Sequence, residues 1–302
     1  MFMDFNQRVA VVTGAGGGLG RQYALALAAR GAKVVVNDLG GTVDGSGSSS
    51  TAAQAVVNEI RSAGGEAIAN GASVTDFEAV QGMVADAMST WGRVDILINN
   101  AGILRDKSFA KMTIEDFRLV LDVHLMGAVN CTKAVWDIMR NQNYGRIMMT
   151  TSSSGLYGNF GQANYGAAKM ALVGLMQSLS IEGSKHNIHV NSLAPTAFTR
   201  MTDSVMPDMG NLLTPESVVP AMLVLTHESA PTRTILCAGA GTFEAAHITM
   251  TDGVHIGADG SAPERLAHSL GQVTDRAGSM VPEAAVVQGR NEIEKANAAM
   301  DR

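Results

Sequence analysis

Two side chains that can exchange protons stand four residues apart in the stretch NYGAAKMALVGLMQS, which is otherwise mostly apolar or small. Residues at i and i+4 of a helix share one face, so Tyr165 and Lys169 would lie side by side. A phenol is a poor base because its reference pKa is about 10. A nearby ammonium and a positively charged cofactor ring would favour the phenolate, so that Tyr165 could take a proton from an alcohol or give one to a ketone. Such a pair alone is most often helix surface, but a lysine among apolar residues needs a partner or a purpose.

The same stretch, continued to residue 184, is apolar or small on nearly every side. Such a pattern indicates a helix that is buried on more than one face. The small residues Gly166, Ala167, Ala168 and Gly174 would let another helix approach closely. We therefore expect this helix to pack against a sheet and also against a second subunit, in a homodimer or a homotetramer.

A glycine-rich turn, TGAGGGLG at 13–20, lies where an expected strand meets an expected helix. Glycines there let backbone N–H groups approach a pyrophosphate, and the helix N-terminus attracts negative charge. Asp38 ends the next expected strand, where a carboxylate can accept both hydroxyls of an adenosine ribose and repel a 2′-phosphate. Arg21 is the counter-signal, because its guanidinium could reach such a phosphate, pair with a carboxylate or face solvent. We weigh the acid more heavily and predict NAD as the cofactor, with four contacts from the turn: Gly14, Gly18, Leu19 and Gly20.

The elements that would position these groups alternate along the chain. Strands are expected at RVAVVTG, KVVVND, EAIANGASV, VDILINNAG, RIMMTTSS and IHVNSLAP, helices lie between them, and TRTILCAGAG could add a last strand. A long helix is expected after Thr113. This order predicts an α/β fold with a doubly wound parallel sheet, the Rossmann fold. We assign residues 1–256 to a single domain and residues 257–302 to a C-terminal extension that ends in a helix.

Composition limits the partners. The 302 residues carry a formal net charge of −6 and no basic stripe, which argues against nucleic acid and anionic membranes. No apolar run approaches the ~20 residues of a membrane span, and the N-terminus lacks a signal-peptide pattern. Cys131 and Cys237 have no metal-ligand spacing, so we expect no metal site. Two isolated thiols favour a reducing cytoplasm.

Several motifs together make the chain resemble the short-chain dehydrogenase/reductase family from about residue 8 to 250. They are TGAGGGLG, NNAG at 99–102, a serine ahead of YGNFGQANYGAAK, and NIHVNSLAP. The resemblance implies that Tyr165 and Lys169 are catalytic and bind the cofactor, and that Ser152, thirteen residues before the tyrosine, holds the substrate oxygen. It also implies cofactor contacts from Val74, Asn100, Ala101, Gly102, Pro195 and Phe198. Two positions depart from the family pattern: Ser73 stands where an acid often precedes the valine, and Thr196 where a glycine usually follows the proline.

A narrower similarity joins NDLGG, the Gly/Ser loop after it, GNFGQANYGAAK and NIHVNSLAP to the dehydrogenase portion of peroxisomal multifunctional β-oxidation enzymes. It implies NAD-dependent interconversion of a (3R)-hydroxyacyl-CoA and a 3-ketoacyl-CoA, by a stand-alone dehydrogenase because no hydratase or sterol-carrier sequence follows. The alternatives are a 17β-hydroxysteroid or another lipophilic substrate and, in a different class, a non-catalytic NAD-binding protein.

The sequence gives weaker signals for the residues that would surround such a substrate. Residues 199–217 would form an apolar lid or an ordinary surface loop with some buried methionines. The apolar side chains in question are Met201, Met206, Met209, Leu212 and Leu213. Arg105, Lys107 and Arg200 are candidates for holding an anionic CoA, although solvation at the surface is the simpler explanation for each.

His124 stands in the middle of LDVHLMGAVN, a stretch with helical spacing. From its neighbours alone, a satisfied core histidine is the simpler interpretation. In many short-chain dehydrogenases this place carries asparagine in the setting Asn-x-x-Gly, which helps hold a water that leads to the catalytic lysine. Gly127 keeps that spacing here, and the multifunctional subgroup resembles this chain in having histidine. The resemblance therefore implies that His124 lies behind Lys169 and either fixes the helix or relays its proton.

Overall fold

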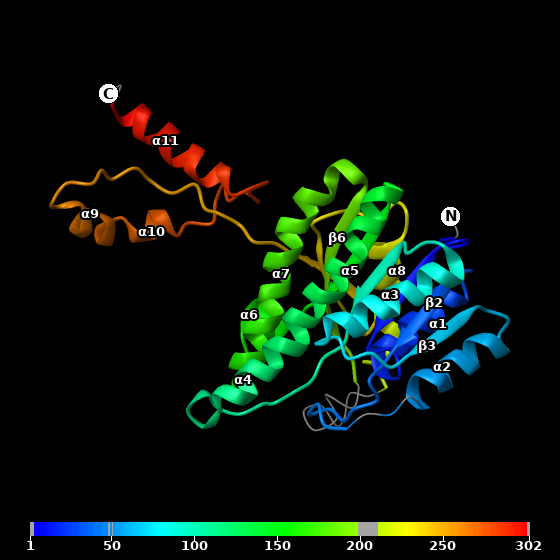
Figure 1. The fold of residues 1–302 in the computed structure, drawn as a ribbon. Helices are drawn as coiled ribbons and strands as arrows, with labels where there is room; N and C mark the ends of the chain where they lie inside the picture. Colours follow the sequence, from blue (N-terminus) through cyan, green and yellow to red (C-terminus); the bar gives the residue numbers. More distant parts are fainter. Residues whose placement is uncertain (1–2, 48, 50, 199–210, 301–302) are drawn as a thin grey trace. The chain divides into compact units, whose positions relative to one another are not determined.

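The computed structural model describes residues 3–47, 49, 51–198 and 211–300 of the chain. Within these residues, eight strands form one sheet in the order β3-β2-β1-β4-β5-β6-β7-β8, and helices alternate with the strands along the chain (Figure 1). The registered pairs from β3 across to β7 are all parallel. The fold is the doubly wound, Rossmann-type sheet that the sequence predicts.

The strands are β1 Val9–Thr13, β2 Lys33–Asn37, β3 Ala67–Asn70, β4 Ile96–Asn99, β5 Gly145–Thr150, β6 Ile188–Thr196, β7 Ile235–Gly239 and β8 Thr242–Ala246. The α-helices are α1 Gly18–Ala28, α2 Thr51–Ser62, α3 Phe77–Trp91, α4 Ile114–Leu121, α5 Gly127–Gln142, α6 Ser153–Tyr157, α7 Ala163–Gly183, α8 Val219–Thr226, α9 Ala262–His268, α10 Leu270–Val273 and α11 Val286–Met300. Each predicted strand is present, including β7 in TRTILCAGAG, and β8 is an addition that the sequence does not predict.

The sheet is covered on both faces. Every residue of β1, β4 and β5 is buried, which agrees with strands that are mostly apolar and do not alternate, Arg146 of β5 being the charged exception. One face packs against α1, α2 and α8 in the largest cluster of buried side chains, which includes Tyr23, Val57 and Met222. On the other face, α3 packs beside α5, and α7 follows (Figure 1).

The long helix expected after Thr113 is interrupted. The Thr113 hydroxyl accepts a hydrogen bond from Asp116 N and starts α4, which ends at Leu121. Residues Asp122–Met126 then form a π-helical turn, η2, and α5 begins at Gly127. Single π-helical turns within helices are rare and are frequent at functional sites. This turn carries His124.

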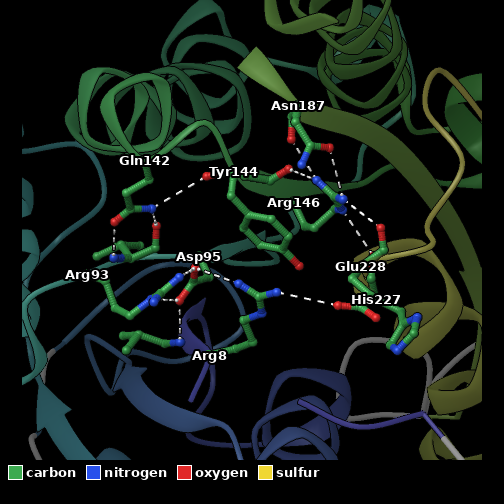
Figure 2. Close-up of polar contacts among 12 residues, drawn as sticks. Arg8, Arg93, Asp95, Gln142, Tyr144, Arg146, Asn187, His227 and Glu228 are labelled. Atoms are coloured by element: carbon green, nitrogen blue, oxygen red, sulfur yellow. Dashed lines mark hydrogen bonds and ion pairs between the residues drawn. The ribbon is translucent and has the colours of Figure 1, made fainter. Parts of the chain in front are cut away.

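A polar cluster ties together the starts of β1 and β4 (Figure 2). The Asp95 carboxylate is fully buried and accepts hydrogen bonds from Arg93 Nε and Nη2 at 2.7 and 2.6 Å. It also accepts one from Val9 N at 2.9 Å and lies 3.5 Å from Arg8 Nη1. Because its partners come from the start of β1 and from the turn before β4, the buried charge is compensated and joins these two segments.

The same cluster extends to β5 through Arg146, which is 1% exposed. Its guanidinium donates hydrogen bonds to oxygen atoms of Gly145, Asn187, His227 and Glu228. The Tyr144 ring lies against two cations, with the guanidinium carbons of Arg8 and Arg146 at 3.9 and 4.4 Å from its centroid (Figure 2). These contacts lie at the amino ends of the strands, opposite to the edge that carries the glycine-rich turn.

By its internal contacts the chain divides into two compact units, Met1–Ala245 and Ala246–Arg302. The first contains the catalytic and cofactor candidates. The second contains α9, α10 and the expected terminal helix α11, and an isolated bridge joins Met250 to Met280. Among the described residues, no helix is long and apolar enough to cross a membrane. Nor does that part of the chain bring together three or more His, Cys, Asp or Glu side chains that could hold a metal ion.

Candidate active site

A cavity of about 220 Å³ opens beside the glycine-rich turn, where the order of the strands reverses between β1 and β4. Doubly wound sheets bind their ligands at this place. The expected cofactor residues that line the cavity are Gly14, Gly18, Leu19, Asp38, Val74, Asn100, Ala101 and Gly102. The remaining candidates, which lie outside this lining, are Gly20, Tyr165, Lys169, Pro195 and Phe198.

Close approach explains two glycines of the turn. Gly14 has φ +62°, and a Cβ there would lie 2.9 Å from Ala101 Cα. At Gly20, which sits in the first turn of α1, a Cβ would lie 2.2 Å from the Gly14 carbonyl oxygen. The residue before α1, Gly17, supplies no side-chain cap to the helix. The bare N-terminus and the glycine cradle therefore fit a pyrophosphate.

Asp38 is held in place by two backbone donors. Its Oδ2 accepts a hydrogen bond from Gly16 N and its Oδ1 one from Gly40 N, both at 2.7 Å. Arg21, the counter-signal in the sequence, turns instead to α2, where its Nη2 bonds both carboxylate oxygens of Glu59 at 2.7 and 2.6 Å. The carboxylate therefore stands at the cavity wall, and the guanidinium is paired with another acid.

Asn100 and Ala101 fasten the turn to the end of β4. The Asn100 side chain donates to the carbonyl oxygens of Thr13 and Gly14 at 3.0 and 3.2 Å. The backbone N–H groups of Asn100 and Ala101 both donate to the Thr13 hydroxyl at 3.0 Å. Thr13 was not among the residues expected at the site. Its hydroxyl is the point that joins β1 to the NNAG segment.

The structure brings the four expected catalytic residues together. Ser152 follows β5 and caps α6, where its Oγ accepts a hydrogen bond from Ser154 N at 3.2 Å. Lys169 Nζ lies 5.4 Å from the centroid of the Tyr165 ring, one turn away on α7. The rings of Tyr165 and His124 meet edge to face, 5.2 Å apart. Three elements, the β5–α6 turn, α7 and the π-helical turn, thus meet at one place.

Burial sets the proton affinities of the pair on α7. It lowers the pKa of Lys169 to about 7, and the ammonium donates to the Thr150 carbonyl oxygen at 2.6 Å. Burial raises the pKa of Tyr165 to about 12, although a hydrogen bond with the Ser152 hydroxyl lowers it in part. In the chain alone, burial therefore outweighs the effect that we expected from the lysine.

His124 is buried behind this pair. Its Nε2 lies 3.0 Å from Ile103 N and 2.8 Å from Ile103 O, while its Nδ1 has no hydrogen-bond partner among the described residues. A cavity of about 10 Å³, roughly the room for one water molecule, is lined by both His124 and Lys169. Burial, followed by the charge of Lys169, lowers the pKa of His124 to about 3, so the ring is neutral. Gly102 is required beside it, because a Cβ there would lie 2.2 Å from His124 Cε1.

Two further polar residues, which sequence reasoning missed, hold the site. Asn164 is fully buried; its Nδ2 donates to Arg105 O at 3.1 Å, and its Oδ1 accepts from Tyr165 N at 2.7 Å. Asp116 accepts from Arg105 Nη1 at 3.1 Å and from Lys107 Nζ at 2.9 Å, and the Lys107 bond lowers the pKa of Asp116. Two of the three candidate CoA cations are therefore paired with one buried carboxylate. Neither residue stands out in the local sequence, because Asp116 lies beside Glu115 and Asn164 follows Gln162 by two positions.

Not all of the expected surroundings of the substrate can be placed. Arg200 and residues 199–210 of the expected lid lie outside the described residues. The rest of the lid follows from residue 211, where Leu212 is 71% exposed and Leu213 O accepts a hydrogen bond from Phe198 N. Phe198 therefore joins the end of β6 to this segment.

Comparison with known proteins agrees with this geometry. A model of the short chain dehydrogenase family matches residues 8–210. Peroxisomal hydratase-dehydrogenase-epimerase of Saccharomyces cerevisiae is 52% identical, over 90% of this chain and 31% of its own length. Peroxisomal multifunctional enzyme type 2 of Mus musculus is 56% identical, over 75% of this chain and 31% of its own length. The chain thus spans about a third of the length of these two relatives. A putative short-chain type dehydrogenase/reductase of Mycobacterium tuberculosis is 46% identical, over 91% of this chain and 96% of its own length.

Solved structures show the same kinship. Full-length peroxisomal multifunctional enzyme type 2 from Drosophila melanogaster superposes with a TM-score of 0.79 at 38% identity, covering 97% of this chain and 50% of its own. A 7α-hydroxysteroid dehydrogenase complexed with NADH and 7-oxo glycochenodeoxycholic acid gives a TM-score of 0.72 at 29% identity, over 80% of this chain and 98% of its own. By its motifs, its sheet and these relatives, the chain belongs to the short-chain dehydrogenase family and is an oxidoreductase.

Proposed function

We propose that the protein is an NAD-dependent dehydrogenase that interconverts a (3R)-hydroxyacyl-CoA and a 3-ketoacyl-CoA. The observation that carries the proposal is the meeting of Ser152, Tyr165 and Lys169 near a cavity whose glycine-rich wall fits a pyrophosphate. The choice of a fatty-acyl thioester rests on relatives at 50% identity or more that are named hydratase-dehydrogenase-epimerase or multifunctional enzyme.

The choice of NAD rests on Asp38 and Arg21. With both of its oxygens fixed by backbone donors, the Asp38 carboxylate would accept the adenosine ribose hydroxyls and repel a 2′-phosphate. Arg21 is engaged with Glu59 and would have to leave that ion pair to hold such a phosphate. The glycine turn would hold the pyrophosphate, and the bound nicotinamide would supply the hydride acceptor or donor.

The protein's own task is to hold the substrate and move one proton. Ser152 would hold the substrate oxygen, and Tyr165 would take the hydroxyl proton on oxidation or return it on reduction. A positive charge near the phenol favours its ionised form, and Lys169, with a pKa near 7, can change its protonation during turnover. His124, which is neutral and shares a one-water cavity with Lys169, is placed to fix or to relay that proton.

The test is NADH oxidation, followed by absorbance, with a 3-ketoacyl-CoA series and a 17-ketosteroid side by side, each repeated with NADPH. We expect turnover with the thioesters and NADH, and loss of turnover in Tyr165→Phe with NADH binding retained. Tight NADH binding without turnover of any ketone would contradict the proposed dehydrogenase activity and favour the non-catalytic NAD-binding alternative.

A steroid or another lipophilic ketone is the second candidate substrate. The observation that favours it is the likeness to a hydroxysteroid dehydrogenase solved with a bile-acid ligand. Turnover of the 17-ketosteroid in preference to every thioester would select this alternative.

We also propose that the chain is a homodimer or homotetramer that pairs through α7. One face of that helix is exposed along its length and consists of Ala163, Ala167, Met170, Gly174, Ser178 and Ile181. These small and apolar residues would allow a second helix to pack closely. Sedimentation should give a multiple of one chain's mass, and Gly174→Trp should reduce it; a single-chain mass for the wild type would contradict the pairing.

A cytoplasmic location stays a prediction from the two isolated thiols, whereas several relatives are named peroxisomal.

A further inference from the structure

The loop between β2 and α2 contributes to the wall of the cofactor cavity. Five residues of the segment 39–47, here called the strap, line that cavity: Leu39, Gly41, Thr42, Val43 and Gly45. No other loop supplies more of the described lining. The strap therefore lines the space that a bound dinucleotide would occupy.

The strap holds its own shape. Thr42 N donates to Ser46 O at 2.8 Å, and Gly45 N donates to Thr42 O at 3.0 Å. The Asp44 carboxylate accepts hydrogen bonds from the hydroxyls of Thr42 and Ser46, and these bonds lower the pKa of Asp44 to about 2. Because the ring closes within five residues, the strap can move as a unit.

Apart from the hydrogen bonds of Leu39 and Gly40 at its base, the strap is attached to the rest of the chain at one place. Within the described residues, the hydrogen bonds that 41–47 make outside the loop go to Leu104 N, which donates to Val43 O at 3.0 Å, and to Arg105 Nε, which donates to Asp44 O at 2.7 Å. Gly45 lies against Ile103, where an added Cβ would be 3.2 Å from that side chain. Segment 103–105 is therefore the fastening point.

Arg105 is itself anchored on the side away from the strap. Its Nη1 donates to the buried carboxylate of Asp116 at the start of α4, and its carbonyl oxygen accepts from Asn164 beside Tyr165. The guanidinium thus bridges α4 and the strap with two different nitrogens. Lys107 bonds the other oxygen of Asp116, and within the described residues no hydrogen bond or ion pair joins its ammonium to the strap.

We propose that Arg105 is a positioning residue that latches the strap over the cofactor and slows cofactor release. This inference rests on the proposed dinucleotide site. Opening the strap breaks the bonds from Arg105 to Asp44 O and from Leu104 to Val43 O. A hydrogen bond from a charged donor is stronger than a neutral one. We therefore expect Arg105→Ala to speed NADH dissociation about tenfold. Arg105→Lys should resemble it, because one ammonium cannot replace the fork that reaches both Asp116 and Asp44 O.

The experiment measures NADH dissociation by stopped-flow fluorescence, with excess NAD as the displacing ligand and no substrate present. Lys107→Ala is the matched control: it removes the same charge and another bond to Asp116, but leaves the latch, so it should release NADH at the wild-type rate. A second variant deletes residues 42–46 and joins Gly41 to Gly47, whose neighbours are already within hydrogen-bond distance in the strap. This strap-less chain should also release NADH about tenfold faster.

Combining Arg105→Ala with the deletion of 42–46 distinguishes a latch that acts through the strap from a general effect of losing the arginine. If Arg105 acts through the strap, Arg105→Ala should add nothing to the strap-less chain. A tenfold effect in both backgrounds, or an equal effect of Lys107→Ala, would overturn the latch and leave the proposed function standing. A wild-type chain that binds neither NADH nor NADPH would overturn both.

Discussion

Replacing Lys169 with methionine should make the folded chain more stable at pH 6 and less stable at pH 10. Lys169 is 3% exposed, and burial lowers its pKa from 10.5 to about 7. Between these two values the unfolded chain holds more protons than the folded chain. The stability of the wild type therefore rises with pH across this range, and the ammonium opposes folding most strongly below pH 7.

The magnitude follows from the pKa change. Each pKa unit corresponds to about 1.4 kcal/mol, so the buried charge opposes folding by about 5 kcal/mol below pH 7 and by nothing above about pH 10.5. Methionine has no charge to bury, but it leaves the Thr150 carbonyl without the donor that now lies at 2.6 Å. That loss costs about 1–3 kcal/mol. The variant should thus gain about 2–4 kcal/mol at pH 6 and lose about 1–3 kcal/mol above pH 10.

The assay is urea unfolding followed by circular dichroism at pH 6, 8 and 10. Lys133→Met is the control, because Lys133 is exposed on α5 and its side chain is in contact with solvent in the folded chain. For this control we expect no crossover. Parallel stability curves for Lys169→Met and wild type would refute the reasoning, since they would mean that the lysine binds its proton equally in both states.

Three further outcomes follow from the geometry of the site and of the opposite edge. Gly102→Ala would place a Cβ 2.2 Å from His124 Cε1, so we expect NADH binding at least tenfold weaker in a fluorescence titration, while Gly71→Ala, whose Cβ meets nothing within 4 Å, binds as wild type. His124→Ala should lower kcat across pH 6–9 and His124→Asn should restore much of it, because an amide can also bond the Ile103 backbone; full kcat with unchanged stability in the alanine variant would contradict this. Arg146→Met leaves several carbonyls without their donor, so urea unfolding should show a loss of about 3–5 kcal/mol, with kcat of the folded enzyme within twofold of wild type.

The sheet could be predicted because its signals are local. Runs such as VAVVT and ILIN are apolar at every position but the last, and glycines follow them within a few residues, so strand, turn and helix can be placed without knowing any distant partner. Strand β8 gives no such signal, since four of its five residues are exposed. The π-helical turn gives none either, because its residues keep an ordinary helical composition.

The site could be predicted only where the type and spacing of nearby residues indicate a role. The spacing of Tyr165 and Lys169 places them together, but the strength of burial around them depends on packing from three elements. From its position beside the glycine turn, Arg21 could have contacted a phosphate. In the structure it pairs with Glu59, which lies 38 residues away in the sequence. The bond between Arg105 and Asp44 spans 61 residues, and that between Val9 and Asp95 spans 86. Pairings at such separations leave no trace in local sequence.

The π-helical turn at Asp122–Met126 places one more residue between α4 and α5 than a regular helix would hold in the same turn. Because the wide turn absorbs that residue, α4 and α5 keep the phase of one continuous helix. A single-residue deletion here would therefore restore a regular helix without rotating α4 against α5, and Val120 and Ala168 would stay in their shared buried cluster. The deletion would instead remove the bulge that carries His124, whose ring contacts Ile103 and Tyr165. We expect such a chain to keep its helices in register and to lose the contacts of the imidazole.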